Sequence, residues 1–566
     1  MKIDISKIPF SRYGSFLSIT KENNDGLLAI RNIKRIWDEV ETFYLSFKAS
    51  GKEVSYRMEA DPSCINVYSD KGSAVIYLKG REEIVIVTRS LEIVLHAAEK
   101  QGVFAYRSGD SRYSYLLYLS DSFADLGILQ GIGEEDFVQE IRNNRQTQTR
   151  STVNILPVNG CAMIHLRISD LEKPYDMQGI DWKKDITEIE EQWNQFLAKL
   201  PPVNDKWREA AELAWYNMWA SYVPAGGNFK YDAMLMSKGY MSAVWSWDHC
   251  FNAMALAKSD LKAALEQFFL MFELQDPYGK IPDLITGTRI SWVYTKPPVH
   301  GWCFMKLIQG CDVEPDVLKK AYNHLESWTE WYFEFRDTDS DGIPNYITGY
   351  DSGWDNASVF DIGCNIESPD LCAFLFLQMK ALEEIARRLN DIETALKWKK
   401  RADDFLVKFI DHSWTGSGFA AKISGTHEYE EEPGCLLVLM PLVLGEFLNP
   451  DMRDVLIDKL VRKFITKFGA ATESPDSPKY MEDGYWRGPI WAPVTYLLAD
   501  GLSRSGRPEL AKKLAESYCN MTAQSKGFNE NYNALTGHGL CDRGYTWTAS
   551  VSVLLMNEFL NYEVKD

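Results

Sequence analysis

Two stretches of the sequence place a carboxylate among aromatic residues in glycine-rich segments. Residues 349–361 read GYDSGWDNASVFD and hold Asp355 between Trp354 and Asn356. Residues 528–539 read FNENYNALTGHG and hold Glu530 two positions before Tyr532. Glycine and aspartate alone are typical of solvated turns, but a large ring beside the acid is not explained by turn geometry. The two acids are therefore candidates for chemistry as well as for loop structure.

Several of the 18 tryptophans also lie in Gly/Pro-rich segments instead of periodic runs. Two more such motifs are VWSWDHCF (244–251), with Trp247 and Asp248, and YWRGPIWAP (485–493), with Trp486, Arg487 and Trp491. Flat apolar rings beside polar groups suit sugars, whose C–H faces stack on rings while their hydroxyls need hydrogen bonds. Each motif alone has a plainer interpretation: Asp248 as a helix cap, Arg487 as an ion-pair partner, Glu530 as a solvated acid.

A third acidic segment, RDTDSDGIPNY (336–346), has the spacing of a calcium loop. Such loops supply oxygens at positions 1, 3, 5, 7 and 9 and a glycine at position 6. The predicted ligands are Asp337, Asp339, Asp341, the Ile343 carbonyl and Asn345. Position 12 is Thr348 instead of an acid, so a distant carboxylate would have to complete the shell. The alternative is a solvated acidic turn. A bound ion would have a structural role, bracing the loop that carries Asp355.

The elements that must position these residues change character along the chain. Short β-branched and aromatic runs separated by turn residues fill the first 170 or so positions and predict a β-sandwich. Residues 181–200 have helical spacing and end at Pro201-Pro202. Beyond them we count about twelve helical segments joined by alternating long and short loops, which favours an (α/α)6 barrel. We therefore expect an α+β multidomain protein with a β-sandwich at 1–175, a linker with a helix at 176–204 and a barrel at 205–566.

Composition excludes several partners. The chain has 566 residues, a net charge of −19 and no basic tract, so nucleic acid and anionic membranes are poor partners. No apolar run approaches the roughly 20 residues of a spanning helix, and the start has no signal-peptide pattern. Ten scattered cysteines without a CxxC pair predict reduced thiols and a cytoplasmic protein.

Five motifs in one order resemble glycoside hydrolase family 63. They are WSWDHCF, KPPVHGWC (296–303), SGWDNAS, YWRGPIWAP and ENYNALTG. The resemblance covers roughly 205–566, and the family shares a clan of inverting glycosidases with the family 37 trehalases. It implies an (α/α)6 barrel and catalysis without a cofactor. Some members also carry calcium at a similar loop.

The resemblance also implies roles. Asp355 corresponds to the general acid and Glu530 to the general base, and Trp247 and Asp248 to residues that hold the sugar. The remaining expected substrate-binding residues are Trp354, Asn356, Trp486, Arg487, Trp491 and Tyr532. Chemistry agrees, because inversion needs two carboxyl groups about 6.5–9.5 Å apart with water between one of them and the sugar. We expect Trp354 to give the acid an apolar wall, Asn356 to orient it, and Tyr532 to hold the base by a hydrogen bond.

The implied substrate is an α-linked, gluco-configured di- or oligosaccharide, with manno- and galacto-sugars left open. Trehalose is not a safe assignment, because Arg543 stands where trehalases have an acidic residue. Two other functions remain. An inverting disaccharide phosphorylase needs one acid and a phosphate pocket, and a non-catalytic carbohydrate-binding relative needs no opposed carboxylates.

Overall fold

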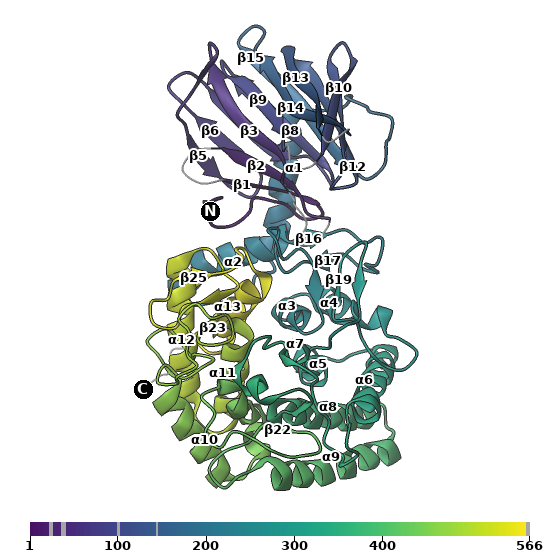
Figure 1. Ribbon diagram of the computed structural model, residues 1–566, viewed down its shortest axis with the longest axis vertical. Helices are drawn as coiled ribbons and strands as arrows, with labels where there is room; N and C mark the ends of the chain where they lie inside the picture. The colour runs from purple at the N-terminus through teal and green to yellow at the C-terminus, as the bar shows by residue number, and fades with distance from the viewer. Residues whose placement is uncertain (22–26, 35–40, 99–101, 143–144, 562–566) are drawn as a thin grey trace.

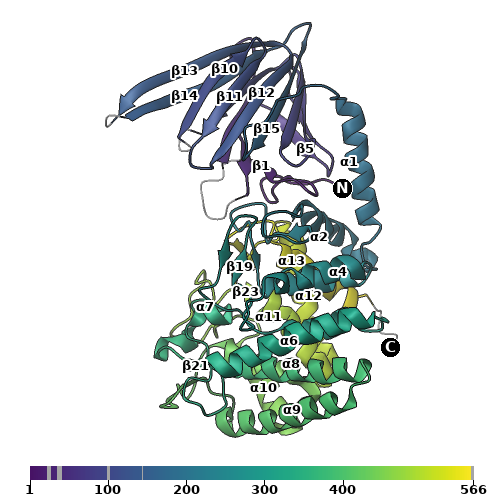
Figure 2. The same ribbon diagram turned by 90° about the vertical axis from the view of Figure 1, so that its right-hand side faces the viewer.

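The structure is a computed structural model that describes residues 1–566 except 22–26, 35–40, 99–101, 143–144 and 562–566. A strand-rich part is followed by a ring of helices (Figure 1). Helix α1 (Trp182–Leu197) runs along the side and connects them (Figure 2). Asp181 caps α1 by accepting from the backbone N–H groups of Lys183 and Lys184, and Pro201-Pro202 follow its end as the sequence predicts.

The strand-rich part is a pair of antiparallel sheets. One has the order β1 (Leu17–Lys21), β2 (Leu28–Asn32), β3 (Glu41–Ala49), β9 (Glu92–Ala97), β14 (Arg145–Leu156), β13 (Ile132–Arg142), with β4 (Lys52–Glu53) on β3. The other has the order β10 (Val103–Gly109), β11 (Arg112–Leu117), β12 (Ser122–Gln130), β15 (Cys161–Ser169), β8 (Glu83–Arg89), β7 (Ser73–Leu78), β6 (Ile65–Tyr68), β5 (Arg57–Ala60). In β3, Phe43, Leu45 and Phe47 are buried while the residues between them are partly exposed, which is the alternation of a half-buried strand.

The helices form a closed double ring. Its inner members, in contact order, are α3 (Asp248–Ala257), α5 (His300–Leu307), α8 (Pro369–Arg388), the 3₁₀ segment Leu436–Phe447, α11 (Ala492–Arg504) and α13 (Thr546–Glu558), and α13 contacts α3 again. Each inner member packs on an outer one: α4 (Leu261–Phe269), α6 (Pro315–Phe335), α9 (Ile392–Ser413), α10 (Pro450–Lys463), α12 (Pro508–Ser525) and α2 (Arg208–Ala220). Over the described residues this is an (α/α)6 barrel.

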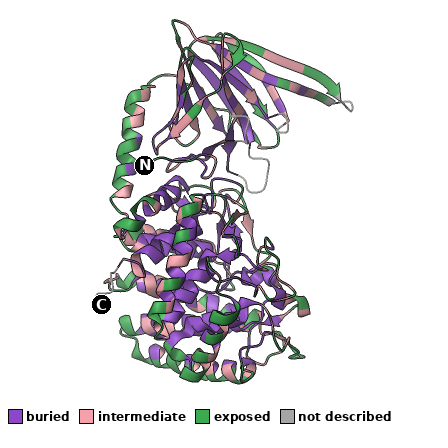
Figure 3. Cartoon of the chain, turned by 90° about the vertical axis from the view of Figure 1, so that its left-hand side faces the viewer, coloured by how far each residue is buried: buried purple, intermediate pink, exposed green. Residues whose placement is uncertain are grey.

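Burial explains which helices are inside. In α13 every residue from Thr546 to Met556 is buried, as expected for a helix surrounded by others. In α9 the buried residues are spaced three or four apart, so only one face meets the ring. The barrel interior is accordingly buried and its outer surface mixed (Figure 3).

One inner member differs from its predicted form. One of the twelve helical segments expected from the sequence is the apolar run at 433–447, but Leu436–Phe447 adopts 3₁₀ geometry. Pro441 lies inside this segment and has no N–H to donate, and Gly445 breaks it with a positive φ of 55°. A Cβ at Gly445 would also come within 2.6 Å of the Arg504 side chain, so the kink requires glycine.

At one end of the ring the long loops contain short strands, which hydrogen-bond to one another in small sheets. They are β16 (Tyr222–Val223), β17 (Ala233–Met234), β18 (Val244–Trp245), β19 (Leu284–Ile285), β20 (Ile290–Ser291), β21 (Ile366–Glu367), β22 (Lys422–Ile423), β23 (Ile490–Trp491), β24 (Asn531–Tyr532) and β25 (Gly539–Leu540), with the one-turn helix α7 (Gly349–Ser352). All ten cysteines are free thiols. None of the helices in the described ranges has the length and apolarity needed to cross a bilayer.

Candidate active site

Loops that precede inner helices surround a cavity of about 300 Å³. Asp248 begins α3, Lys296 precedes α5 and Asp355 precedes α8, while Trp486 precedes α11 and Glu530 precedes α13. The lining residues are Met241, Trp245, Trp247, Asp248, Asp283, Leu284, Tyr294, Lys296, Tyr350, Gly353, Asp355, Tyr485, Trp486, Glu530, Tyr545 and Trp547. The ring thus brings five of the residues expected from the sequence to one cavity, although they are spread over nearly 300 positions.

The glycines of the 349–361 stretch allow Asp355 to approach the other loops closely. Gly353 has a φ of 71°, and a Cβ there would lie 2.9 Å from the ring of Trp247. A Cβ at Gly349 would lie 2.4 Å from the carbonyl oxygen of Asp355. Buried Asp351 fastens the same loop by accepting from the Thr295 N–H (2.9 Å) and the Ile347 N–H (2.8 Å). The stretch is therefore a packed loop and not a solvated turn.

Glu530 is held from two sides and is only 4% exposed. The hydroxyl of Tyr485 donates to its Oε1 (3.1 Å), and the backbone N–H of Asp542 donates to its Oε2 (3.4 Å). The indole of Trp547 donates to the Glu530 carbonyl (3.1 Å), which fixes the backbone. The carboxylate is therefore positioned before any ligand binds.

Burial raises the pKa of all four carboxyl groups that line the cavity, including that of Asp283 beside Lys296. It raises the pKa of Asp355 to about 6, with Lys296 opposing the rise and Asp283 adding to it. It raises the pKa of Glu530 to about 8, with the charge of Asp542 adding to the effect. The pKa of Asp248 also rises to about 8, again through burial, and Lys296 opposes it. Such groups can hold or release a proton near neutral pH.

Lys296 is the buried cation among these acids. Its Nζ lies 3.0 Å from Asp283 Oδ1 and donates to the Tyr350 carbonyl (2.7 Å). Burial alone would lower the pKa of Lys296, but the charges of Asp283, Asp355 and Asp248 outweigh it and raise the pKa. Sequence reasoning missed Lys296, Asp283 and Tyr485. Lys296 and Tyr485 begin two of the quoted motifs, so their position was a usable signal, whereas Asp283 lies in none of them.

Four expected substrate-binding residues are outside the lining; Trp354 and Trp491 are buried, Arg487 is half-buried and Asn356 is exposed. The ring of Trp491 stacks on that of Trp486 with 3.8 Å between centroids, and Trp354 lies 4.8 Å from Trp486 on another side. Asn356 accepts from the Trp486 N–H (2.9 Å) and donates to the Gly484 carbonyl (3.0 Å). Arg487 donates to the Asn356 carbonyl (2.8 Å) and pairs with Asp361 (2.5 Å). These side chains join the loop of Asp355 to that of Tyr485 and Trp486.

The fifth, Tyr532, does not hold the base. Its hydroxyl accepts from the Asn529 N–H (3.0 Å) and lies 3.3 Å from Ser525 Oγ. The ring of Tyr532 packs toward α12, 6.3 Å from the ring of Tyr518, so its hydroxyl lies away from the Glu530 carboxyl group. Tyr485 makes the bond to Glu530 instead.

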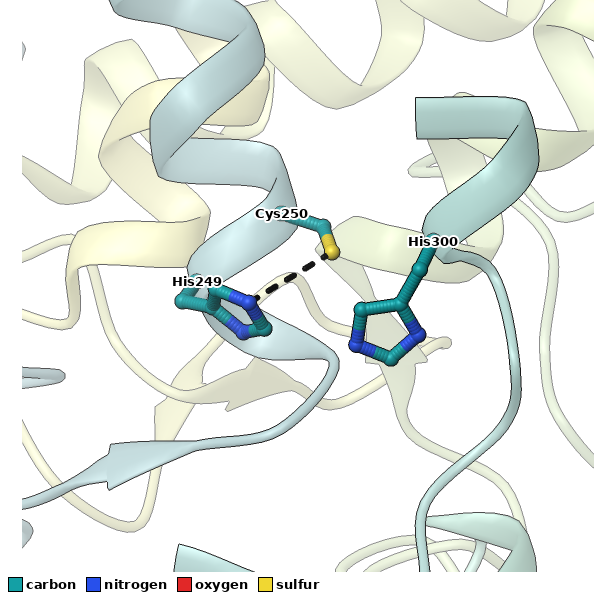
Figure 4. Close-up of side chains that lie close together, drawn as sticks. All are labelled: His249, Cys250 and His300. Atoms are coloured by element: carbon teal, nitrogen blue, oxygen red, sulfur yellow. Dashed lines mark hydrogen bonds between the residues drawn. The ribbon is translucent and has the colours of Figure 1, made fainter. Parts of the chain in front are cut away.

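Beneath Asp248, the first turns of α3 and α5 bring two histidines and a cysteine together (Figure 4). His249 Nδ1 donates to the Trp245 carbonyl (3.0 Å), and its Nε2 lies 3.9 Å from Cys250 Sγ. Burial lowers the pKa of His249 to about 4 and that of His300 well below its usual value. The two imidazole rings are therefore neutral, and they pack at the start of α3, the helix that carries Asp248.

In the acidic loop the three predicted carboxylates converge, with ligand oxygens within 4.8 Å of one another. Asp337 Oδ2 accepts from the Gly342 N–H (3.0 Å) and Asp341 Oδ1 from the Ile343 N–H (2.7 Å). Asn345 is fully buried, and its Oδ1 accepts from the Thr338 hydroxyl (2.9 Å). The calcium site stays a prediction, and its expected Asn345 oxygen already has a partner.

Known proteins share this architecture. The chain is similar to a glucosylglycerate hydrolase from Mycolicibacterium hassiacum, with 21% identity over 54% of this chain and 90% of that protein. A family 63 mannosylglycerate hydrolase structure from Thermus thermophilus matches 61% of this chain and 98% of its own, at 17% identity and a TM-score of 0.53. A bacterial glucoamylase structure matches 99% of this chain and 94% of its own, at 13% identity and a TM-score of 0.68. The last match spans both the strand-rich part and the helical ring, and confirms the predicted fold class.

A sequence model of one family covers the cavity. The "mannosylglycerate hydrolase MGH1-like glycoside hydrolase domain" matches residues 241–548, more than half of the chain. That range contains Trp247, Asp248, Asp355, Trp486 and Glu530. The chain therefore belongs to the MGH1-like glycoside hydrolases of family 63.

Proposed function

We propose that this protein hydrolyses an α-linked, gluco-configured and uncharged di- or oligosaccharide with inversion of the anomeric centre. The observation that carries the proposal is the pair of carboxyl groups of Asp355, which is half-buried, and Glu530, which is buried; they belong to different loops and line the same cavity. In this mechanism Asp355 protonates the leaving oxygen while Glu530 removes a proton from the attacking water. The aromatic rings of Trp247 and Trp486 give the cavity apolar walls for the C–H groups of the sugar.

The order of the two pKa values has a consequence for this assignment. Glu530, with a pKa of about 8, holds a proton to higher pH than Asp355, with a pKa of about 6. Between these values the pair carries one proton, mostly on Glu530. The reactive form, with the proton on Asp355, is then the minor of the two arrangements. The pKa values obtained from the rate and its pH profile therefore belong to the coupled pair and not to either residue alone.

Charge in the cavity supports an uncharged substrate. The described lining holds four acids, Asp248, Asp283, Asp355 and Glu530, and one cation, Lys296. Lys296 is already paired with Asp283. Burial keeps Asp248 and Glu530 protonated to about pH 8, so Asp355 is the unpaired charge of the described lining near neutral pH. A glycerate carboxylate or an inorganic phosphate would meet this charge without an unpaired lining cation to offset it. The same observation disfavours the phosphorylase alternative.

The gluco configuration rests on the family resemblance and on the neighbours. The Thermus mannosylglycerate hydrolase was solved with glucose and the bacterial glucoamylase with acarbose. The cytoplasmic location and the domain division at 1–175, 176–204 and 205–566 are proposed on the sequence patterns given above.

The test is a substrate panel followed by NMR of the first product. Neutral α-glucobioses should be cleaved with kcat/KM at least about tenfold above that for glucosylglycerate or mannosylglycerate, a difference of about 1.4 kcal/mol. The first product from an α-glucoside should be the β anomer. Preference for glucosylglycerate would overturn the uncharged substrate alone. A retained α anomer would overturn the inverting mechanism, and sugar binding without hydrolysis would point to the non-catalytic alternative.

A further inference from the structure

A second group of candidate ligands lies outside the cavity, on the side of the ring that carries the acidic loop. It consists of Asp341, Glu367 in β21, His412 in the last turn of α9, and His427 after β22. One ligand atom from each lies within 4.8 Å of the others. The four residues come from four separate segments, so the fold and not a local turn assembles them.

Glu367 is the most informative member. It is fully buried, and neither of its carboxylate oxygens makes a hydrogen bond to any described residue. Its Oε2 lies 2.8 Å from His412 Nε2, and this nitrogen too lacks a hydrogen bond in the described structure. Because no described residue satisfies either atom by a hydrogen bond, both remain available to a shared third partner. A buried carboxylate of this kind needs a cation.

The other separations fit a single small ion. His427 Nε2 lies 3.6 Å from Asp341 Oδ2 and 3.9 Å from Glu367 Oε2. The same nitrogen also hydrogen-bonds to Asp339 Oδ2 (3.1 Å), a contact that a bound ion would replace. Ligands about 2.0–2.1 Å from a tetrahedral zinc ion are about 3.3 Å apart. Two imidazoles and two carboxylates form a donor set for zinc and similar ions, whereas calcium selects oxygen ligands.

We propose that Asp341, Glu367, His412 and His427 bind one divalent first-row transition ion, with zinc as the expected metal. Four protein ligands leave no open position, so the ion is structural. It fastens the acidic loop to α9 and to β21, and Ile366 of β21 pairs with Tyr346 just before α7 and Asp355. The proposal differs from the predicted calcium site in using both histidines and Glu367, and it shares only Asp341 with that site.

The first experiment measures metal in the full chain, purified without a metal-affinity step. Elemental analysis should find about one zinc per chain, as a four-ligand closed site implies. Removal by a chelator should lower the Tm, and Zn²⁺ but not Ca²⁺ should restore it. Glu367→Gln and His427→Gln should each weaken zinc binding by at least about tenfold. His538→Gln, an exposed histidine elsewhere, is the matched control and should retain zinc.

Cobalt gives a readout that does not depend on activity or stability. Co²⁺ added to the metal-free chain should show the intense visible absorption of tetrahedral coordination, and His427→Gln should lose it. This variant is suitable because the His427 side chain is 41% exposed and its change leaves the core intact. Zinc and cobalt binding that is unchanged in Glu367→Gln and His427→Gln would overturn the proposal. So would stabilisation by Ca²⁺ alone that Asp337→Asn abolishes, which would assign the ion to the acidic loop.

Discussion

At the scale of single residues, the two carboxyl groups have separable tasks. Asp355→Asn and Glu530→Gln should each lower kcat/KM by about 10²–10⁴-fold, the usual cost of removing an acid–base group. Loss of Asp355 should matter most for poor leaving groups, because good ones need little protonation. Loss of Glu530 should affect all substrates alike, since water is activated in every case. Aryl glycosides with leaving groups of graded pKa measure the difference, and equal dependence in both variants would contradict the roles.

The same residues predict a bell-shaped pH dependence. Below about pH 6 both acids are protonated and no base is left, and above about pH 8 both are ionised and no acid is left. The Tyr485 hydroxyl lowers the pKa of both groups by hydrogen bonding, so Tyr485→Phe should move both limbs to higher pH. Tyr545→Phe, which removes a bond to Asp248 (3.3 Å), should leave the limbs in place. The profile of kcat/KM against pH measures both variants, and unmoved limbs in Tyr485→Phe would refute the explanation.

At the scale of elements, the loops before α8 and α11 act as one unit. Asn356→Ala removes two hydrogen bonds between them, which should cost about 1–3 kcal/mol of stability. We expect kcat/KM to fall about tenfold or more, because misplacing Asp355 or Trp486 disturbs the site without removing a lining group. Thermal melting and kinetics measure the two effects. Asn323→Ala, at an exposed position of α6, is the control and should change stability by less than about 0.5 kcal/mol.

The elements also show what the sequence could predict. Helical spacing was sufficient for α9, whose buried residues recur every three or four positions. Helical spacing failed at Leu436–Phe447. The apolar composition of this run fits an α-helix, but Pro441 within it disfavours one. Motifs located Asp355 and Glu530, but the bond from Tyr485 and the group around Glu367 depend on contacts between distant loops. Such contacts follow from the closed ring and leave no local pattern.

At the scale of the whole molecule, the sandwich supports the rim of the cavity. Arg31 of β2 is buried, pairs with Glu41 (2.9 Å), and lies over the ring of Tyr240 at 4.7 Å. The N–H of Tyr240 donates to Asp542 (3.0 Å), whose carbonyl accepts from the Glu530 N–H (2.9 Å). A chain of contacts thus connects a sheet of the sandwich to the proposed base.

This connection can be tested with two variants. Arg31→Ala removes the buried ion pair with Glu41, whose other contacts include the Tyr240 hydroxyl (3.1 Å), and should cost about 3–5 kcal/mol. The double variant Arg31→Met/Glu41→Leu should recover most of that stability, because both charges are gone. Activity should stay low in the double variant, since Tyr240 still lacks its support. Full recovery of kcat/KM together with Tm would mean that the sandwich contributes only stability.

The burial of Glu530 and Asp248 makes the stability of the folded chain depend on pH. In the folded protein both groups have pKa values of about 8, above their ordinary values, so the folded state favours their protonated forms. The resulting contribution to the free energy of unfolding is complete below about pH 4 and is lost as pH rises through about 8. Glu530→Gln should therefore have the same Tm as the parent at pH 4 and a higher one at pH 8, as a thermal scan at both would measure. A lineage released from catalysis would gain stability by losing these acids. Keeping both acids therefore costs the folded chain stability near and above neutral pH, a cost that the proposed catalysis would explain.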